Sequence, residues 1–183
     1  MSRIAVFFAE GYEEIEALTV VDICRRAGIE VQMIAVNGEQ AVKGSHGIGV
    51  QMDAAFATVD FDSLDMLVLP GGMPGTRNLE AHQGLMEQVD AFYRDGKYVA
   101  AICAAPSILG HRGILQGRKA GCYPGWEEQL TGARVSMDPA SVDGNVITGR
   151  GMGCAIPFAL AIVAQLLGQE QADRVAESIV YPA

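Results

Sequence analysis

The 183-residue sequence predicts a single α/β domain, residues 1–183, in which helices cover both faces of a doubly wound, mostly parallel sheet. Short apolar segments alternate with helical segments of about 10–15 residues, which is the pattern of consecutive β-α-β units. Two apolar segments, MLVL at 66–69 and YVAAI at 98–102, are hydrophobic throughout, as expected for strands buried on both faces. The length also lies within the usual range of about 100–200 residues for one domain.

The first half of the chain supplies two strands, one helix and a hairpin or loop. The segment RIAVFFA at 3–9 is rich in β-forming residues and ends just before a glycine-containing turn, as a buried strand does. The helical pattern that follows spans about 13–27 and stops at Gly28, a typical C-terminal capping residue. Residues 29–36 form the second predicted strand, and the glycine-rich segment 37–50 predicts a hairpin or a loop.

The second half continues the alternation of strands and helices. Residues 65–70 and 97–102 predict buried strands that lead into the loops PGGMPG and CAAP. The other predicted elements are a helix over 78–96 broken near Gly84, a short helix over 104–113, a short strand, turn and helical stub in 118–130, a strand and loop over 145–153, and helices over 154–168 and 169–181.

The charge balance argues against several classes of function. The formal net charge of -9 and the isoelectric point near 4.7 disfavour binding to nucleic acids or to anionic membranes. No segment approaches the roughly 20 apolar residues of a membrane span, and the amino-terminal segment lacks the pattern of a secretory leader. We therefore expect a cytoplasmic protein that binds neither nucleic acid nor membrane.

The four cysteines do not form a metal or dithiol motif. Cys24, Cys103, Cys122 and Cys154 are scattered, with no C-x-x-C pair and few histidines near them, so no metal site is expected. Free cysteines are usually small buried side chains, and this reading suits Cys24 and Cys154 because they lie in apolar helical patterns.

Cys103 has a different setting. In KYVAAICAAPSIL it directly follows a predicted strand, and Pro106 suits the first turn of a helix. Ala101 and Ala105 provide the small residues that a tight nucleophile elbow needs two positions to either side. The free N–H groups at the helix start favour the thiolate and predict a lowered pKa for the thiol of Cys103. The local sequence leaves open an ordinary core cysteine at a strand end.

Other candidate groups also follow strands, where ligands bind in open α/β sheets. The backbone N–H groups of Gly72 and Ala104 could form an oxyanion hole, although PGG could equally be only a tight turn. The segment GRGMGCA at 149–155 fails the spacing and the position of a dinucleotide-binding motif. No P-loop is present, so no cofactor is expected.

Glu14 is the candidate acid. It lies at the edge of the apolar face of the first helix, where the local sequence favours a simple partner of the helix dipole. The alternative is a partly buried acid whose raised pKa lets it donate a hydrogen bond to a thiolate. A histidine beside the cysteine would complete a common nucleophilic pair, but sequence spacing does not show whether His46, His82 or His111 reaches it.

The segments FFAEGYEEIEALTVVDICRRAG, DMLVLPGGMPG, KYVAAICAAPSIL and TGRGMGCAIPFALAIV together resemble the ThiJ/PfpI superfamily, closest to its parkinsonism-associated deglycase (DJ-1-like) branch. The resemblance covers nearly the whole chain. It implies a flavodoxin-like fold, a homodimer, and a reactive Cys103 hydrogen-bonded to a protonated Glu14. It also implies that the N–H groups of Gly72 and Ala104 face the sulfur.

Two positions depart from the pattern of relatives. Several relatives carry a histidine before a proline near the cysteine, where this chain has Tyr123 in GCYPGW. A tyrosine has a pKa of about 10 and is a poor base at neutral pH, which weakens a peptidase or amidase role. His46 replaces an arginine of some relatives and could bind a substrate oxygen only when protonated.

The leading hypothesis is a cofactor-free glyoxalase or deglycase that acts on 2-oxoaldehydes or their early glycation adducts. Cys103 would add to the aldehyde, Glu14 would move protons, and the amides of Gly72 and Ala104 would hold the oxyanion. The alternative is a redox-sensing or chaperone-like stress protein whose cysteine is oxidised by peroxide and which has no dedicated substrate.

Overall fold

The computed structural model describes residues 1–182 and has a seven-stranded sheet in the order β10-β11-β7-β6-β1-β2-β5. Every neighbouring pair is parallel except β10 with β11, so the predicted doubly wound, mostly parallel sheet is confirmed. The strands of this sheet are β1 (Arg3–Phe8), β2 (Glu30–Ala35), β5 (Ala54–Ala55), β6 (Met66–Leu69), β7 (Tyr98–Ile102), β10 (Ala140–Asp143) and β11 (Val146–Gly149).

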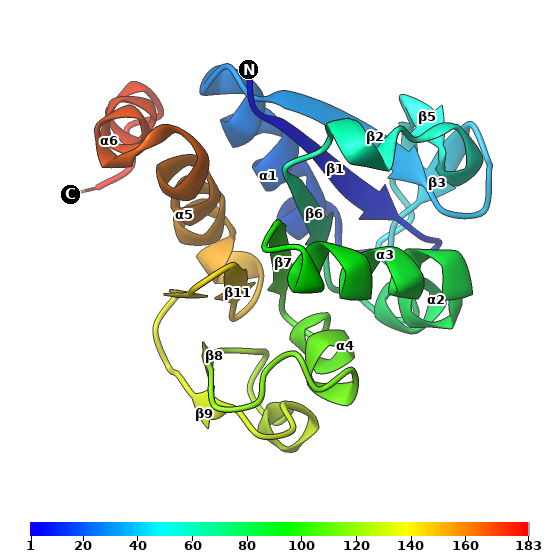
Figure 1. The fold of residues 1–183 in the computed structure, drawn as a ribbon. Helices are drawn as coiled ribbons and strands as arrows, with labels where there is room; N and C mark the ends of the chain where they lie inside the picture. Colours follow the sequence, from blue (N-terminus) through cyan, green and yellow to red (C-terminus); the bar gives the residue numbers. More distant parts are fainter. Residues whose placement is uncertain (183) are drawn as a thin grey trace.

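Helices cover both faces of the sheet, and each face has its own hydrophobic core. Figure 1 shows α5 and α6 on one side of the central strands and α2 and α3 on the other. Side chains of α1, α5 and α6 form one core, and side chains of α2, α3 and α4 form the second. The helices are α1 (Glu14–Arg26), α2 (Gly75–Ala81), α3 (Gln83–Arg94), α4 (Pro106–His111), α5 (Ala155–Leu167) and α6 (Gln169–Ser178).

Two small sheets lie outside the central one. The predicted hairpin in 37–50 is confirmed as β3 (Ala41–Lys43) paired antiparallel with β4 (Gly49–Gln51). The second small sheet pairs β8 (Lys119–Ala120) with β9 (Arg134–Val135). Four short 3-10 helices complete the described residues: η1 (Phe56–Thr58), η2 (Phe61–Ser63), η3 (Glu127–Gln129) and η4 (Met152–Cys154).

The break in the predicted helix over 78–96 lies at His82, two residues before the predicted point at Gly84. The side chain of His82 accepts a hydrogen bond from the N–H of Leu85 at 3.0 Å and so caps α3. Its ring also lies 4.4 Å from that of Phe56. This histidine therefore has a structural role at the start of α3 and does not approach Cys103.

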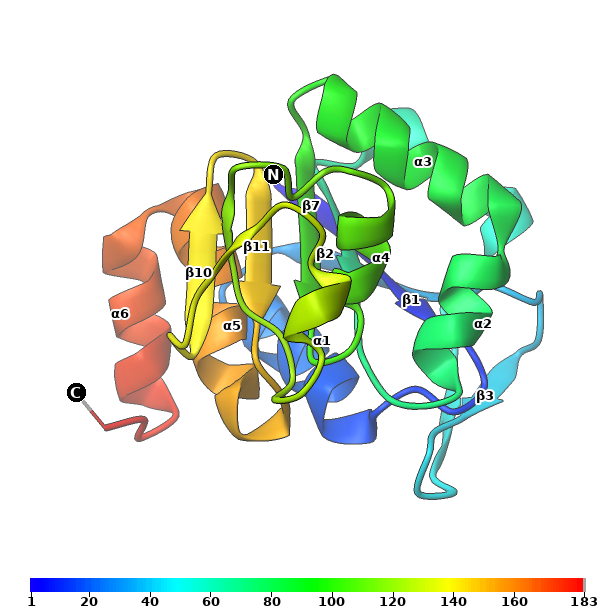
Figure 2. The ribbon, with the colours of Figure 1, turned by 90° about the horizontal axis from the view of Figure 1, so that it is seen from below.

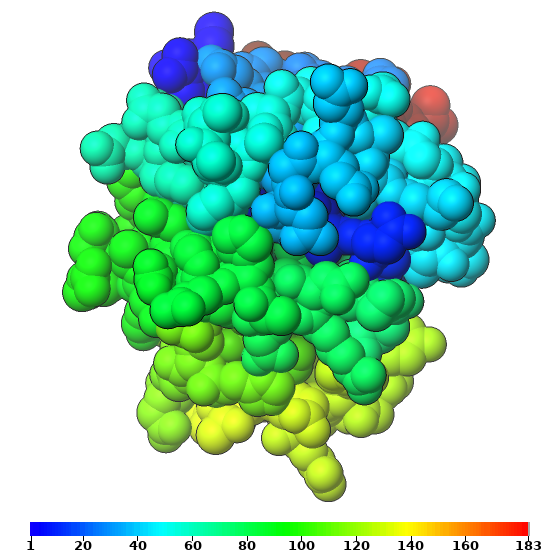
Figure 3. Space-filling model, turned by 90° about the vertical axis from the view of Figure 1, so that its right-hand side faces the viewer, coloured from blue at the N-terminus to red at the C-terminus, as the bar shows by residue number. Residues whose placement is uncertain are grey.

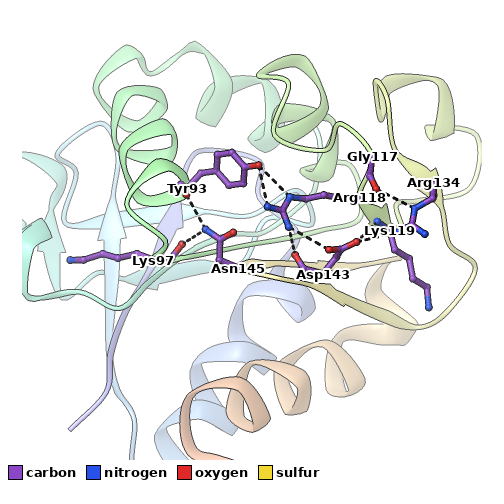
Figure 4. A network of polar contacts seen from close by, with 8 residues as sticks. All are labelled: Tyr93, Lys97, Gly117, Arg118, Lys119, Arg134, Asp143 and Asn145. Carbon is purple, nitrogen blue, oxygen red and sulfur yellow. Dashed lines mark hydrogen bonds and ion pairs between the residues drawn. The ribbon is translucent and has the colours of Figure 1, made fainter.

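Strand β10 was not predicted, because its sequence ASVD carries little apolar signal. It pairs with β11 at the edge of the sheet, as Figure 2 shows. The hairpin is tied to the rest of the fold by Arg118, whose guanidinium donates to the carbonyl of Asp143 at 2.8 Å and to the hydroxyl of Tyr93 at 3.2 Å (Figure 4). The side-chain amide of Asn145 donates to the carbonyls of Tyr93 and Lys97. These contacts fix the segment after α4 against α3.

Among the described residues, no helix is both long enough and apolar enough to cross a membrane.

Candidate active site

Cys103 lies at the turn between β7 and α4, at the carboxyl edge of the sheet. Its φ of 67° is a left-handed conformation that costs a residue with a side chain about 1–3 kcal/mol. Two hydrogen bonds hold it: its N–H donates to the carbonyl of Gly149 at 2.9 Å, and its carbonyl accepts from the N–H of Tyr123 at 2.8 Å. Ala101 and Ala105, two positions to either side, are fully buried, and both are the small residues that a tight elbow needs there. This is the strand–turn–helix setting of a nucleophile elbow.

Three groups beside the sulfur of Cys103 affect its ionisation. They are the side-chain carboxyl of Glu16 and the backbone N–H groups of Gly72 and Ala104. Gly72 follows β6 and Ala104 follows β7, and these strands are parallel neighbours, so their carboxyl ends meet at the same edge. The structure thus brings Gly72 and Ala104 together at Cys103, where the sequence analysis expected them.

The carboxyl group beside the sulfur belongs to Glu16 and not to Glu14. Glu16 is 1 % exposed, and one of its oxygens, Oε2, accepts a hydrogen bond from the N–H of Gly71 at 3.0 Å. Its own N–H donates to the side chain of Glu13, the N-cap of α1, at 2.7 Å. Burial raises the pKa of Glu16 from 4.5 to about 7, against the opposing effect of its hydrogen bonds to Cys103 and Gly71.

Gly71 is the residue that makes this close pairing possible. A Cβ atom at position 71 would lie 2.6 Å from the Cβ of Cys103 and 2.6 Å from Oε2 of Glu16. Neither neighbour is free to move, since the cysteine is fixed in the turn and the carboxyl is buried. Only glycine therefore fits between the two groups.

Glu14 occupies a different environment, which corrects the sequence-based assignment. Its carboxylate faces the loop of the β3–β4 hairpin and accepts hydrogen bonds from the N–H of His46 at 2.8 Å and of Ile48 at 3.4 Å. His46 Nδ1 lies 2.9 Å from its second oxygen. Burial favours a higher pKa for Glu14, but the hydrogen bonds from His46 and the backbone outweigh it and lower the pKa. The two acids diverge because residues two apart on a helix point about 200° from each other.

The thiol of Cys103 also differs from the expectation. Its pKa is raised, first by burial and then by the negative charge and hydrogen bond of Glu16; the N–H groups of Ala104 and Gly72 oppose this with smaller effects. The prediction of a lowered pKa was wrong because it considered the N–H groups at the helix start but neither the burial of the thiol nor the carboxyl group of Glu16. Near neutral pH the pair therefore holds a thiol beside a carboxyl group that is about half ionised.

Cys103 opens into a cleft of about 460 Å³. His46 and Tyr123 both line it, but neither side chain is among the groups that shift the pKa of the Cys103 thiol. Tyr123 is half exposed, and its backbone N–H is the group that supports Cys103. His46 is mostly exposed and bonds Glu14, which raises its pKa. His111 lies outside this cleft, bonded to Glu80.

Two residues of the site were missed by sequence reasoning, Glu16 and Arg150. Arg150 follows β11 and lines the same cleft, and its buried Nε has no hydrogen-bond partner among the described residues. The sequence could have indicated Arg150, because it directly follows β11, another strand whose carboxyl end lies at this edge of the sheet. An unpartnered guanidinium there is suited to a substrate oxygen.

One group of side chains in residues 1–182 has the spacing of metal ligands. Atoms of Glu13, Glu14 and His46 lie within 4.8 Å of one another. Both oxygens of Glu14 already accept hydrogen bonds from the loop, and the side chain of Glu13 caps α1. These contacts account for the cluster as a structural tie between α1 and the hairpin.

The sequence matches the profile of the DJ-1/PfpI family over residues 2–165. It is 37% identical over 183 residues to protein dj-1beta of Drosophila melanogaster, covering 98% of both chains. It is 33% identical over 150 residues to a protein named deglycase in Pyrococcus abyssi, covering 81% of this chain and 89% of the relative. Among solved structures, oxidized DJ-1 of Toxoplasma gondii superposes with a TM-score of 0.96 at 33% identity, covering 100% of both chains.

Proposed function

Because the chain belongs to the DJ-1/PfpI family, we propose that it is a protective enzyme that converts 2-oxoaldehydes, or their early glycation adducts, through Cys103 without a cofactor. The observation that carries the proposal is the contact between the Cys103 sulfur and the buried carboxyl group of Glu16, whose pKa is about 7. A general base works best when its pKa lies near the working pH. The name deglycase of one relative agrees with this class of reaction.

The first step is the addition of the thiol to the aldehyde carbon. A bond forms between the sulfur and this carbon while ionised Glu16 takes the thiol proton. The N–H groups of Gly72 and Ala104 then stabilise the oxyanion that develops on the former carbonyl. Return of the proton from Glu16 to this oxygen gives a neutral hemithioacetal and restores the carboxylate. A thiol with a raised pKa needs this base, because little thiolate forms at neutral pH.

The second step moves hydrogen within the bound substrate. The carboxylate of Glu16 removes the proton from the hemithioacetal carbon and passes it to the neighbouring carbonyl oxygen, which gives an enediol and restores the carboxylate. Glu16 then takes the hydroxyl proton of the sulfur-bearing carbon and delivers it to the neighbouring carbon, which gives a thioester. Water hydrolyses the thioester to a 2-hydroxy acid and regenerates the thiol. The oxidation of one carbon balances the reduction of the next, so methylglyoxal plus water gives lactate with no external oxidant.

Arg150 is placed to orient the substrate in this scheme. Its guanidinium lines the cleft that contains Cys103 and has an Nε without a partner among residues 1–182. The second oxygen of a 2-oxoaldehyde, or the carboxylate of the product, would supply the missing acceptor.

The test is turnover of methylglyoxal by metal-stripped protein, with lactate measured by NMR. The wild type is expected to form lactate and a Cys103→Ser variant is expected to form none. Cys154→Ser is the matched control, because Cys154 lines the same cleft and is not bonded to Glu16. Equal rates for wild type and Cys103→Ser would refute the proposal.

A second candidate is a stress protein that senses peroxide through Cys103. Partial exposure of this cysteine favours it, since Cys24 and Cys122 are buried and are less accessible to peroxide. Peptide mass spectrometry after a peroxide titration would then find Cys103 oxidised first. Oxidation of Cys24, Cys122 or Cys154 before it would reject this role. The raised pKa of Cys103 favours the enzyme, because peroxide reacts with the thiolate.

A peptidase or amidase role has less support, since none of the groups that bond the sulfur is a histidine.

The expected homodimer and the cytoplasmic location stay predictions. Ile15 and Val180 are exposed apolar side chains that line a hollow of about 610 Å³ beside α1, which suits a covered interface. Sedimentation of the wild type against Ile15→Glu would test the dimer: loss of a dimer in the variant is expected.

A further inference from the structure

A second cleft, of about 300 Å³, lies between α2, α4 and the 3-10 turn η3. It shares no lining residue with the Cys103 cleft. Figure 3 shows the side of the molecule on which the green surface of α2 lies next to the yellow-green surface of the segment after α4. The volume is at the lower end of the range of pockets that hold small molecules.

Thr76 gives the first sign that this cleft takes a ligand. Its side chain is 2 % exposed and lines the cleft, yet its hydroxyl has no hydrogen-bond partner among the described residues. Buried hydroxyl groups are nearly always paired, so an unpaired one requires an explanation. A ligand atom that accepts a hydrogen bond would satisfy this group.

The charged groups of the cleft favour an anion. His111 Nδ1 lies 2.6 Å from a carboxylate oxygen of Glu80, and its Nε2 lies 2.9 Å from the side-chain oxygen of Gln129. The hydrogen bond to Glu80 raises the pKa of His111 and so favours its protonated form. The charges of His111 and Glu80 then cancel. Arg77 also lines the cleft and forms no side-chain hydrogen bond or ion pair within residues 1–182, which leaves one positive charge for a ligand. The chain as a whole carries -9, so this local excess runs against its overall charge.

The remaining walls define the rest of the ligand. The hydroxyl of Ser107 donates to the carbonyl of Ala104 at 2.7 Å, so toward the cleft it can only accept a hydrogen bond. The ring of Trp126 supplies an apolar wall. A matching ligand carries one negative charge, a hydrogen-bond donor near it and a small apolar part.

From this combination we infer that the second cleft binds a small 2-hydroxy carboxylate, with its carboxylate on Arg77 and Thr76 and its hydroxyl on Ser107. The site is separate from the proposed catalytic cleft and does not depend on its activity. Its floor nevertheless touches the same backbone: Thr76 donates from its N–H to the carbonyl of Gly72 at 2.9 Å, and Ser107 bonds the carbonyl of Ala104.

The experiment is isothermal titration calorimetry of the full-length Cys103→Ser protein with lactate, acetate and inorganic phosphate. Lactate is expected to bind with a Kd of about 1 mM, and acetate, which lacks the hydroxyl, about tenfold more weakly. Thr76→Val and Arg77→Met should each weaken lactate binding by about tenfold. Arg94→Met is the matched control, because Arg94 is an exposed arginine on α3 outside the cleft and should leave binding unchanged.

Thermal melting of each variant checks that it is folded, and Thr76→Val should not melt lower than the parent because it removes an unpaired buried hydroxyl. Absence of lactate binding would overturn the inference. Binding of phosphate or acetate as tight as that of lactate would also overturn it. Lactate binding that is lost in Arg150→Met and kept in Arg77→Met would also overturn it, since the ligand would then sit in the Cys103 cleft.

Discussion

Replacing Glu16 by glutamine removes the proposed base and also changes how stability depends on pH. The pKa of this carboxyl is 4.5 in its ordinary state and about 7 in the fold, so the protonated form is favoured by folding. Its contribution to stability is fully present below pH 4.5 and is lost as the pH rises through 7. Between pH 5 and pH 7.5 the wild type should therefore lose about 2 kcal/mol that Glu16→Gln keeps.

Glu14→Gln is the control, and its pH dependence should have the opposite sign. The hydrogen bonds from His46 and the hairpin lower the pKa of Glu14, so its contribution is present above its ordinary pKa and is lost as the pH falls. Urea unfolding of the wild type and both variants at pH 3, pH 5 and pH 7.5 measures the two dependences. The difference between the wild type and Glu16→Gln is compared between pH 5 and pH 7.5, and the difference between the wild type and Glu14→Gln is compared between pH 3 and pH 5. Glu14 also raises the pKa of His46, whose titration lies above pH 5, so it does not enter the comparison between pH 3 and pH 5.

Turnover gives the second readout of the same pair of variants. Loss of a general base lowers kcat by about 10²–10⁴-fold, so Glu16→Gln should be nearly inactive toward methylglyoxal. Glu14→Gln should keep most of its activity because its carboxylate binds the hairpin and not the sulfur. Two results would refute the reasoning. One is an active Glu16→Gln variant together with an inactive Glu14→Gln variant. The other is a change of stability with pH that has the same sign for both carboxyl groups.

Three further changes test the Cys103 site and the attachment of the β10–β11 hairpin. Gly71→Ala should abolish turnover and lower the melting temperature, because the added Cβ would lie 2.6 Å from the Cβ of Cys103. Gly153→Ala is the control: its added Cβ would meet open space, so neither turnover nor the melting temperature should change. Arg150→Met should raise the KM for methylglyoxal by about tenfold with a smaller change in kcat; an unchanged KM would remove Arg150 from substrate binding. Arg118→Ala should lower the free energy of unfolding by about 1–3 kcal/mol through loss of its bonds to Tyr93 and Asp143, as urea unfolding would show; an unchanged midpoint would contradict that role.

The fold and part of the site follow from the sequence for the same reason. Buried parallel strands are continuous apolar segments, and residues placed directly after them lie at one edge of the sheet. Cys103, Gly72 and Ala104 each follow such a strand, so their meeting could be expected. Strand β10 lies at the edge and is half polar, which left no apolar segment to mark it.

The identity of the acid could not be read in the same way. Glu13, Glu14 and Glu16 lie within four residues at the start of α1, and a shift of one residue turns a side chain by about 100°. The carboxyl group that reaches the sulfur depends on the residue at which the helix begins. It also depends on which strands have their carboxyl ends beside the helix. The raised pKa of Cys103 could not be predicted either, since it depends first on the burial of the thiol and then on the carboxyl group of Glu16 in another element.

The most direct test of the Cys103–Glu16 pair is the dependence of kcat/KM on pH for methylglyoxal conversion by the metal-stripped wild type. Because ionised Glu16 takes the thiol proton, kcat/KM should rise with pH through a single ionisation near 7 and fall away below it. A profile that stays flat down to pH 5, or that rises only near the thiol value of about 8.5 or above, would contradict the account.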